Sequence, residues 1–289
     1  MFGDRRLTVI LAVVMLAGCA RARPNGDSIE DNTITSNVSG APQPQPQEST
    51  PTPAPAPVPV NEQFPHAVLF GGTCGGSIIS PNWVITAGHC SIFTSGRYVL
   101  AGTNNSDDGS GTYVHVKRLV IHPRFSVGPY WVDADDFNIQ QVGARYDYML
   151  AELQEPLPLD GKKMAAIKLD DQPSVPVGLE VGYAGYGAEN HGETMRSQMH
   201  GMDLMIMPDQ TCEKLEQYDK LDMLCTQGRP PKLDSACNGD SGSGLVGGGR
   251  LLGVASWVEN DSHECRKGAL VVFSRLSLVR DWIRTVTGV

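Results

Sequence analysis

The sequence is poor in several features that common classes of protein require. Its formal net charge is −9 over 289 residues. No run of basic residues provides a surface for phosphate, so nucleic acid is not an expected partner. No glycine-rich phosphate-binding loop precedes a helical pattern, and no internal repeat is visible. The apolar run near the N-terminus is shorter than the ~20 residues that a membrane-spanning helix needs.

The first residues indicate an export signal. Arg5 and Arg6 precede the apolar run LTVILAVVMLAG, which ends at Cys19 and fits the apolar core of a secretory signal, typically ~7–15 residues. The ending LAGC resembles the lipobox of bacterial lipoproteins, whose cysteine is lipidated and becomes the mature N-terminus. We expect residues 1–18 to be a signal peptide and Cys19 to carry a lipid; an ordinary signal peptide with an incidental cysteine is the alternative.

The cysteine count agrees with a lipid on Cys19. Seven cysteines are present, an odd number that would leave one thiol unpaired. Removing Cys19 leaves six, enough for three disulfides in an oxidising compartment. We therefore expect an exported protein that touches membrane only through its lipid. It would lie in the cell envelope or outside the cell, and Ala20 rather than an acid after Cys19 favours the outer membrane.

Residues 19–60 form a segment with almost nothing large to bury. The stretch APQPQPQESTPTPAPAPVPV is dominated by Pro, Gln, Ala and Thr. Such a segment cannot offset the entropy of ordering, so we expect a solvated, extended tether. At ~3.1 Å per residue, forty residues would reach on the order of 100 Å. A proline-rich binding ligand is an alternative without specific support.

Residues 61–289 have the pattern of a folded all-β domain. Short apolar stretches such as GSIIS, WVITA and LLGVASWV alternate with clusters of Gly, Pro, Asn and Asp, which favours a barrel or sandwich. The last stretch, SLVRDWIRTVTGV, has helical spacing and Ser277 as its cap. One side of that helix would carry Leu278, Val279, Trp282, Ile283 and Val286.

Three separate places carry residues suited to nucleophilic catalysis. Ser241 directly follows Asp240 in the glycine-rich CNGDSGSG, and His89 precedes Cys90 in VITAGHC. Asp147 is an acid inside an otherwise apolar predicted strand within RYDYMLAEL. A buried carboxylate is costly unless it is hydrogen-bonded or paired, and an imidazolium is a suitable partner. A serine hydroxyl needs a base, and the base needs a third group to fix its tautomer. Each residue alone has a structural explanation, but together they predict a triad.

These motifs resemble those of the trypsin–chymotrypsin family of serine proteases. CGGSIISPNWVITAGHC, YDYMLAEL and CNGDSGSGL are similar to its histidine, aspartate and serine motifs, in the same order. The resemblance covers nearly all of residues 61–289. It implies two six-stranded antiparallel barrels, roughly 61–165 and 166–289, with a C-terminal helix. The implied function is a monomeric serine endopeptidase that acts on a protein or peptide substrate and needs no cofactor.

The resemblance also implies a role for each matching residue. Ser241 would attack the scissile carbonyl, His89 would act as general base and then acid, and Asp147 would stabilise the imidazolium. The backbone N–H groups of Gly239 and Ser241 would form the oxyanion hole.

The stretch ASWV has matching roles in the same family. Ser256 would support the buried Asp147, and the substrate backbone would pair with Ser256, Trp257 and Val258.

The cysteines match the family's disulfides. The resemblance pairs Cys74 with Cys90, Cys212 with Cys225 and Cys237 with Cys265. No cysteine remains for a metal, and we expect no metal site. The acidic stretches SDDGSG and VDADDF are better explained as solvated loops than as calcium sites, because they lack a proper ligand pattern.

The specificity pocket differs from that of trypsin. The family's pocket floor aligns with Ser235, which argues against an Arg or Lys preference, although a one-residue shift would place Asp234 there. The two walls, glycines in the family, align with Val258 and Val271; a gapped alignment places Gly268 at the second wall. Two valines would narrow the pocket as in elastases. We expect a small or medium apolar residue before the scissile bond.

Activation is the main departure from the family. Its zymogens are cut before an IVGG-like sequence, and the new ammonium pairs with the acid before the nucleophile, here Asp240. No such sequence precedes FPHAVLF. An unpaired buried carboxylate is costly, so either another cation pairs with Asp240 or the oxyanion hole is imperfect in the uncut chain. We expect the enzyme to fold active without cleavage, with Asp240 bracing the loop.

Two observations limit the alternatives. Ser243 and Gly244 replace a Gly-Pro pair of the family pattern beyond the nucleophile, a change that spares the triad. The competing function is a protease-fold binding protein that has lost catalysis. Such proteins usually lose a triad residue, and all three are present here.

Overall fold

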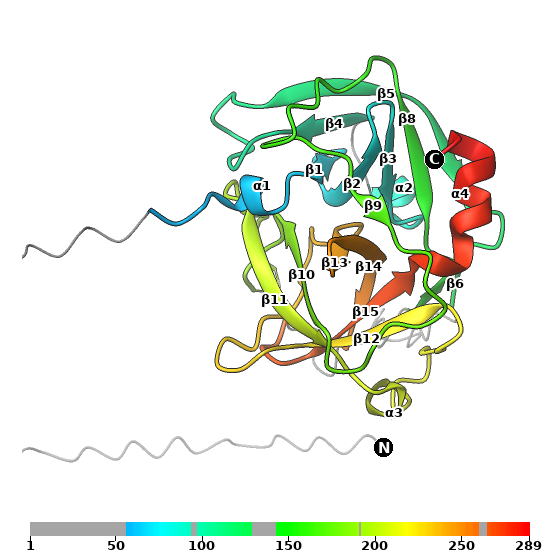
Figure 1. Ribbon diagram of the computed structural model, residues 1–289. Coiled ribbons are helices and arrows are strands. Elements are labelled where there is room, and N and C mark those ends of the chain that lie inside the picture. The colour runs from blue at the N-terminus through cyan, green and yellow to red at the C-terminus, as the bar shows by residue number, and fades with distance from the viewer. Residues whose placement is uncertain (1–55, 94–96, 129–142, 191, 260–264) are drawn as a thin grey trace, which may run out of the picture. The chain divides into compact units, whose positions relative to one another are not determined.

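A computed structural model describes residues 56–93, 97–128, 143–190, 192–259 and 265–289 (Figure 1). The expected signal peptide, Cys19 and most of the expected tether lie outside the described residues, as does VDADDF. The folded part packs from Asn61 onward: this residue is 5% exposed, and its backbone N–H donates to Asn104 Oδ1 at 2.8 Å.

The first barrel is a closed, six-stranded antiparallel sheet with the order β1-β2-β3-β8-β5-β4. β-Branched and aromatic residues recur in its strands, as expected for a pleated sheet with one face in the core. In β5, Val114 and Val116 face inward while their neighbours are exposed. The strands are β1 (Ala67–Phe70), β2 (Cys74–Ser80), β3 (Trp83–Thr86), β4 (Tyr98–Ala101), β5 (Thr112–Ile121) and β8 (Met149–Leu153).

The second barrel has six strands that close through the pairing of β13 with β14. Tyr183, Leu204 and Phe273 are completely buried in its core. β9 (Lys168–Leu169) adds to β14 in parallel. The barrel strands are β10 (Glu180–Gly185), β11 (His200–Ile206), β12 (Met223–Gly228), β13 (Gly244–Gly247), β14 (Arg250–Val258) and β15 (Leu270–Arg275). The predicted pair of six-stranded barrels is confirmed.

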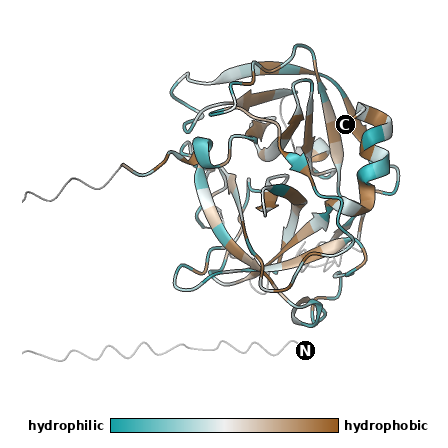
Figure 2. Ribbon diagram, in the orientation of Figure 1, coloured by the Kyte–Doolittle hydropathy of each residue, from teal (hydrophilic) through white to brown (hydrophobic). Residues whose placement is uncertain are grey.

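Short elements connect the strands. They are α1 (Val60–Gln63), α2 (Cys90–Phe93), the hairpin of β6 (Ser126–Val127) with β7 (Ala144–Arg145), and α3 (Asp209–Cys212). Figure 2 shows hydrophobic residues along the strands of both barrels and hydrophilic residues in the connecting loops. The three disulfides are Cys74–Cys90, Cys212–Cys225 and Cys237–Cys265, the pairs that the family resemblance implies.

The C-terminal helix is present, but its start differs from the prediction. A 3₁₀ turn covers Leu276–Val279, and the α-helix α4 covers Arg280–Thr287. Ser277 is not the cap: its Oγ accepts a hydrogen bond from Arg275 Nε at 3.1 Å. The 3₁₀ turn also changes the direction of Leu278, which is 46% exposed. The other apolar residues of the predicted side pack onto the first barrel's core: Val279, Trp282, Ile283 and Val286.

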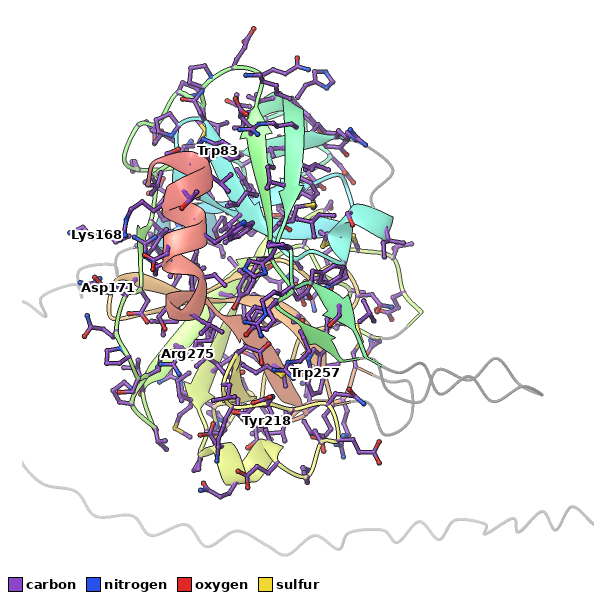
Figure 3. All side chains as sticks on the ribbon, turned by 90° about the vertical axis from the view of Figure 1, so that its right-hand side faces the viewer. Trp83, Lys168, Asp171, Tyr218, Trp257 and Arg275 are labelled. Atoms are coloured by element: carbon purple, nitrogen blue, oxygen red, sulfur yellow. A yellow bond between two sulfur atoms is a disulfide. The ribbon has the colours of Figure 1, made fainter. Side chains whose placement is uncertain are left out.

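Contacts from one loop hold the two barrels together. Tyr148, just before β8, is completely buried, and its hydroxyl donates to the backbone carbonyl of Arg275 at 2.5 Å. Figure 3 shows Arg275 where the two barrels meet. Nearby, Arg145 Nε donates to both carboxylate oxygens of Asp222 at 2.9 Å. Burial raises the pKa of Tyr148 well above its ordinary value, so the hydroxyl remains a donor.

We predict that Tyr148→Phe lowers the free energy of unfolding by about 1–2 kcal/mol, because the Arg275 carbonyl loses the hydrogen bond from this buried hydroxyl. Urea denaturation measures the change. Tyr113→Phe is the matched control: Tyr113 is 58% exposed, and the loss of its hydroxyl should change stability by less than about 0.5 kcal/mol. Equal effects of the two substitutions would contradict the structural role of Tyr148.

Candidate active site

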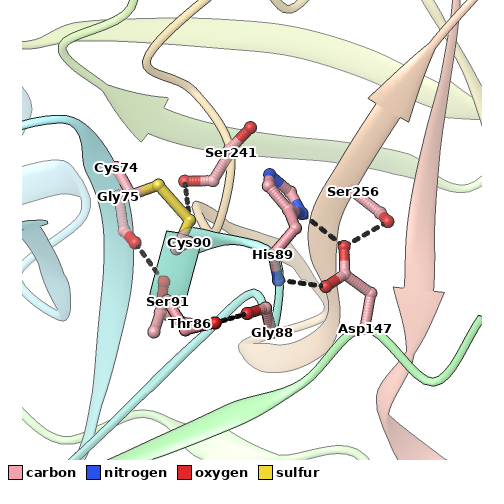
Figure 4. Close-up of polar contacts among 10 residues, drawn as sticks. All are labelled: Cys74, Gly75, Thr86, Gly88, His89, Cys90, Ser91, Asp147, Ser241 and Ser256. Atoms are coloured by element: carbon pink, nitrogen blue, oxygen red, sulfur yellow. Dashed lines mark hydrogen bonds and ion pairs between the residues drawn. A yellow bond between two sulfur atoms is a disulfide. The ribbon is translucent and has the colours of Figure 1, made fainter. Parts of the chain in front are cut away.

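Asp147 and His89 are joined in a buried hydrogen-bond network. Asp147 lies two residues before β8, not within the strand as predicted, and is 0% exposed. Its Oδ2 is 2.6 Å from His89 Nδ1 and accepts from Ser256 Oγ at 2.6 Å. Its Oδ1 accepts from the His89 backbone N–H at 2.9 Å (Figure 4). Because the carboxylate only accepts, Nδ1 of His89 carries a proton, which leaves Nε2 able to act as a base.

The loop that carries Ser241 is fixed to both barrels. The Ser241 carbonyl accepts from Gly75 N at 2.7 Å, and Gly242 N donates to the Ala255 carbonyl at 2.8 Å. Gly242 also lies directly against Thr86: a Cβ there would be 2.2 Å from its Oγ1. Thr86 ends β3, three residues before His89. Ser241 is therefore held beside the histidine, and in Figure 4 the imidazole lies between Ser241 and Asp147.

The backbone of the serine loop is suited to binding an oxyanion. Gly239 has φ +99°, a left-handed conformation that favours glycine. Within the described residues, the N–H groups of Gly239 and Ser241 make no hydrogen bond. The side chain of Met195 lies over Gly239, where a Cβ would be 2.7 Å from the Met195 Cγ. Two unpaired amides beside the serine can therefore bind a negatively charged oxygen.

A cavity of about 180 Å³ opens beside Ser241. The predicted residues Ser256, Trp257, Val258 and Val271 line this cavity. The other described lining residues besides Ser241 are Ala236, Cys237, Asn238, Ala255 and Cys265. The Cys237–Cys265 disulfide thus forms part of its wall.

Ser235, the predicted pocket floor, does not lie among the described residues that line this cavity. Its buried Oγ makes no hydrogen bond there. The adjacent Asp234 turns toward β11, because its Oδ2 accepts from the Asp203 backbone N–H at 3.0 Å. Neither Asp234 nor Gly268 lines the cavity among these residues. The described residues that line the cavity therefore include no acid.

Asp240 is a second buried carboxylate, 0% exposed. Its Oδ2 accepts from Cys237 N at 3.0 Å and from the Tyr183 hydroxyl at 3.2 Å, and its Oδ1 accepts from Gly187 N at 3.1 Å. Burial raises its pKa to about 6, although these hydrogen bonds act in the opposite direction. Asp240 thus joins the serine loop to β10 and to the residues that follow that strand.

Sequence reasoning missed the residues around Asp240. A Cβ at Gly185 or Gly187 would lie 2.6 Å or 2.3 Å from its carboxyl group. The stretch GYAGYG carried this signal, because two glycines so close together can mark a close approach of another group. His200, whose Nε2 lies 3.7 Å from Asp240 Oδ1, had no such signal.

No cluster of His, Cys, Asp and Glu is arranged to hold a metal ion in the part of the chain that the structure describes. None of its helices is long and apolar enough to span a membrane.

Ser243 is completely buried, and its Oγ lies against Gly75, where a Cβ would be 2.2 Å away.

Comparisons with known proteins agree on one family. The Trypsin family model matches residues 47–283. Scolexin B of Heliothis virescens is 62% identical over 285 residues, which are 98% of this chain and 99% of that protein. Trypsin zeta of Drosophila erecta is 31% identical over 74% of this chain and 73% of its own. The structure of mouse neuropsin, a serine protease, has a TM-score of 0.63 and 22% identity over 78% of this chain and 96% of its own, which supports the fold.

The Heliothis virescens protein also bears on the N-terminal segment. It is an insect protein, and its similarity extends over 98% of this chain. This points away from a bacterial lipoprotein signal, so the predicted lipid on Cys19 and the predicted outer-membrane location have no support. The three disulfides still fit a protein exported to an oxidising compartment.

We predict that Gly242→Ala lowers the free energy of unfolding by more than about 2 kcal/mol, since its Cβ would meet Thr86 and strain a positive φ. Gly248→Ala is the control, because Gly248 also has a positive φ but open space around it. The control should cost about 1 kcal/mol. Denaturant titration of both variants measures the difference, and equal losses would contradict the packing of the serine loop on β3.

Proposed function

The chain belongs to the trypsin family of serine proteases, and on that premise we propose that His89, Asp147 and Ser241 are its catalytic triad. The chain is thus a serine endopeptidase, which hydrolyses protein substrates. One observation carries the assignment of the triad. The buried Asp147 carboxylate lies 2.6 Å from His89 Nδ1, beside the loop that holds Ser241.

In the proposed mechanism, His89 moves the proton of the nucleophile. Nε2 accepts the proton of the Ser241 hydroxyl as Oγ attacks the scissile carbonyl carbon. The tetrahedral intermediate collapses, the C–N bond breaks, and the imidazolium gives its proton to the leaving amine. Water then attacks the acyl carbon while His89 Nε2 takes its proton. The bond from that carbon to Ser241 Oγ breaks, and the imidazolium returns the proton to Oγ. Asp147 orients and stabilises the imidazolium, and Ser256 supports Asp147 through its 2.6 Å hydrogen bond.

The oxyanion of each tetrahedral intermediate would bind to the N–H groups of Gly239 and Ser241. Loss of one such donor typically costs ~10²–10³ in rate. Asp240 supports both amides, because its carboxylate binds the Cys237 N–H at the start of the loop. The three hydrogen bonds to Asp240 exist without a cleaved N-terminus, and on this basis we propose that the intact chain is active.

We predict that a fluorophosphonate probe labels Ser241 in the intact, uncleaved chain, because the base and the oxyanion donors are already arranged. Intact-mass spectrometry measures both the label and the N-terminus of the labelled species. Ser241→Ala should abolish labelling. Ser243→Ala is the matched control, since this buried serine is two residues away and has no assigned role; it should still label.

Two outcomes would contradict this proposal. No labelling of the folded wild-type protein would favour the alternative, a binding protein on a protease fold. Labelling that begins only after cleavage near the N-terminus would retain the triad but refute activity of the intact chain.

For specificity, we propose a small or medium apolar residue before the scissile bond. Val258 and Val271 both line the cavity beside Ser241. Two valine side chains leave less space in this cavity than the two glycines of the family pocket would. Trp257 and Val258 lie on β14, where their backbone can pair with an extended substrate. The assignment of Ser235 as the floor of the specificity pocket has weaker support, because Ser235 is not among the described residues that line the cavity.

We predict that peptide substrates with Ala or Val before the scissile bond are cleaved faster than those with Phe or Arg. Val258→Gly should raise kcat/KM for Phe relative to Ala by about tenfold, the effect of a methylene group or more in an apolar pocket. Val246→Gly is the control, since this half-buried valine lies on β13, outside the pocket, and should leave the ratio unchanged. A clear preference for Arg in the wild-type protein would refute the proposed specificity.

We further propose that residues 1–18 direct export, that residues 19–60 form the solvated tether, and that the domain from 61 to 289 acts as a monomer without nucleic acid. The composition of these segments supports the proposal. On this proposal Cys19, the residue directly after the export segment, carries no lipid. The similarity to an insect protein favours this.

A further inference from the structure

Tyr146, the residue before Asp147, has a backbone conformation that is uncommon for its residue type. Its φ is +49°, in the left-handed region. Among the described residues other than glycine, only Leu233 shares a positive φ. A bulky residue in this region is strained, and the conformation persists only where its surroundings determine it. Such residues cluster at functional sites, so the contacts that hold Tyr146 bear on the proposed triad.

The left-handed residue begins a tight turn around Asp147. The backbone N–H of Tyr148 donates to the Tyr146 carbonyl at 2.8 Å, which closes a three-residue turn with Asp147 at its centre. On one side of the turn, the Tyr148 hydroxyl is bound to the Arg275 carbonyl. At its centre, the Asp147 carboxylate lies 2.6 Å from His89 Nδ1. The direction of that carboxylate therefore depends on the backbone of Tyr146.

The ring of Tyr146 is held by two side chains of one neighbouring segment. The His122 ring stacks on it, with 5.2 Å between the ring centroids and 12° between the planes. The guanidinium carbon of Arg124 lies 3.9 Å from the centroid of the same ring. The segment also holds the turn itself, because the His122 backbone N–H donates to the Tyr148 carbonyl at 3.0 Å. Ring and turn are thus fixed together.

Asp222 holds the backbone of the same residue from the second barrel. This carboxylate is 0% exposed. Its Oδ2 accepts from the Tyr146 backbone N–H at 3.2 Å and from Arg145 Nε at 2.9 Å. The Asp222 carbonyl in turn accepts from the backbone N–H of Arg275 at 2.8 Å. Contacts from both barrels therefore determine the left-handed conformation of Tyr146.

We propose that Tyr146 is a positioning residue for catalysis: its ring, held by His122 and Arg124, keeps the left-handed turn that directs the Asp147 carboxylate at His89. This inference rests on the proposed protease function. Tyr146 is not among the described residues that line the cavity beside Ser241, so it acts through Asp147. Without the ring contacts, the strained conformation loses its compensation, and in part of the molecules Asp147 turns away from the histidine.

The test compares Tyr146→Ala with Tyr146→Phe in the full chain, with kcat and KM measured on one peptide substrate. Misplacement of a catalytic group by about 1 Å can cost on the order of 10²-fold in rate. We therefore expect Tyr146→Ala to lower kcat by about tenfold or more, with KM within about threefold of wild type. Tyr146→Phe retains the ring, and its kcat should stay within about twofold of wild type.

A spectroscopic measurement separates this role from a loss of stability. The 2.6 Å between His89 Nδ1 and Asp147 Oδ2 places a proton in a short hydrogen bond, which should give a separate downfield ¹H resonance. Its loss in His89→Ala assigns it. The resonance should persist in Tyr146→Phe. In folded Tyr146→Ala it should disappear or shift upfield, because the carboxylate no longer stays against the imidazole.

Arg124 provides a second test of the ring contact, with a matched control. Arg124→Ala should lower kcat about threefold, in keeping with the contribution of an exposed cation over a ring. The same substitution in Tyr146→Ala should have no further effect, because the contact is already lost. Arg118→Ala is the control: its guanidinium carbon lies 5.4 Å from the Trp83 ring, outside the turn, and its loss should leave kcat unchanged.

The inference is overturned if Tyr146→Ala lowers kcat by less than about fivefold, or if kcat falls while the downfield resonance stays in place. Equal losses in Tyr146→Phe and Tyr146→Ala would also refute a role of the ring. If Tyr146→Ala does not fold, an unchanged kcat in Arg124→Ala refutes the inference. A wild-type chain that hydrolyses no peptide would refute the proposed function instead, and the resonance would still report whether Tyr146 positions Asp147.

Discussion

The candidate active site depends on one constraint: the loop from Cys237 to Gly242 is hydrogen-bonded to both barrels. The Ser241 carbonyl binds the first barrel through Gly75 N, and the absence of a side chain at Gly242 lets the loop lie on Thr86. On its other side, Gly242 N binds Ala255 of the second barrel. Ser241 and His89 come from different barrels, and these contacts of the loop with both barrels bring the two residues together.

Two buried carboxylates serve this site in different ways. Asp147 lies against an imidazole and two further donors, and in the proposed mechanism it prepares His89 to take a proton. Asp240 receives only neutral donors, and its pKa is raised to about 6. We propose that these environments separate the roles of the two carboxylates: Asp147 takes part in the chemistry through the histidine, and Asp240 holds the shape of the serine loop.

The chemistry could be predicted from the sequence because it is carried by local motifs. Asp147 stands out as an acid among apolar residues, and His89 and Ser241 lie in short patterns that resemble one family. The barrels follow from the alternation of apolar stretches and turn residues. Each of these signals is contained within a few neighbouring residues.

Features that depend on three-dimensional contacts escaped this reasoning. Ser235 aligns with a pocket floor, but it is not among the described residues that line the cavity beside Ser241. Ser277 has the chemistry of a helix cap, yet a 3₁₀ turn moves the α-helix start to Arg280. His200 is forty positions from Asp240, and only the pairing of β10 with β11 brings them close.

The lipobox interpretation of LAGC shows a different limit. Four residues after an apolar run are a weak pattern, and an insect relative that matches 98% of the chain outweighs them. By contrast, the proposed triad combines three separate motifs in order, and in the structure Asp147 contacts His89, whose imidazole lies between Asp147 and Ser241.

The most direct measurement is a ¹³C NMR titration of the Asp240 carboxyl carbon in the intact chain, assigned by the loss of its signal in Asp240→Asn. If the carboxylate is buried and holds the serine loop without a cleaved N-terminus, it should titrate with a pKa of about 6. Titration near the ordinary aspartate value of about 3.9 would show a solvated carboxylate and a loop that is not held as described.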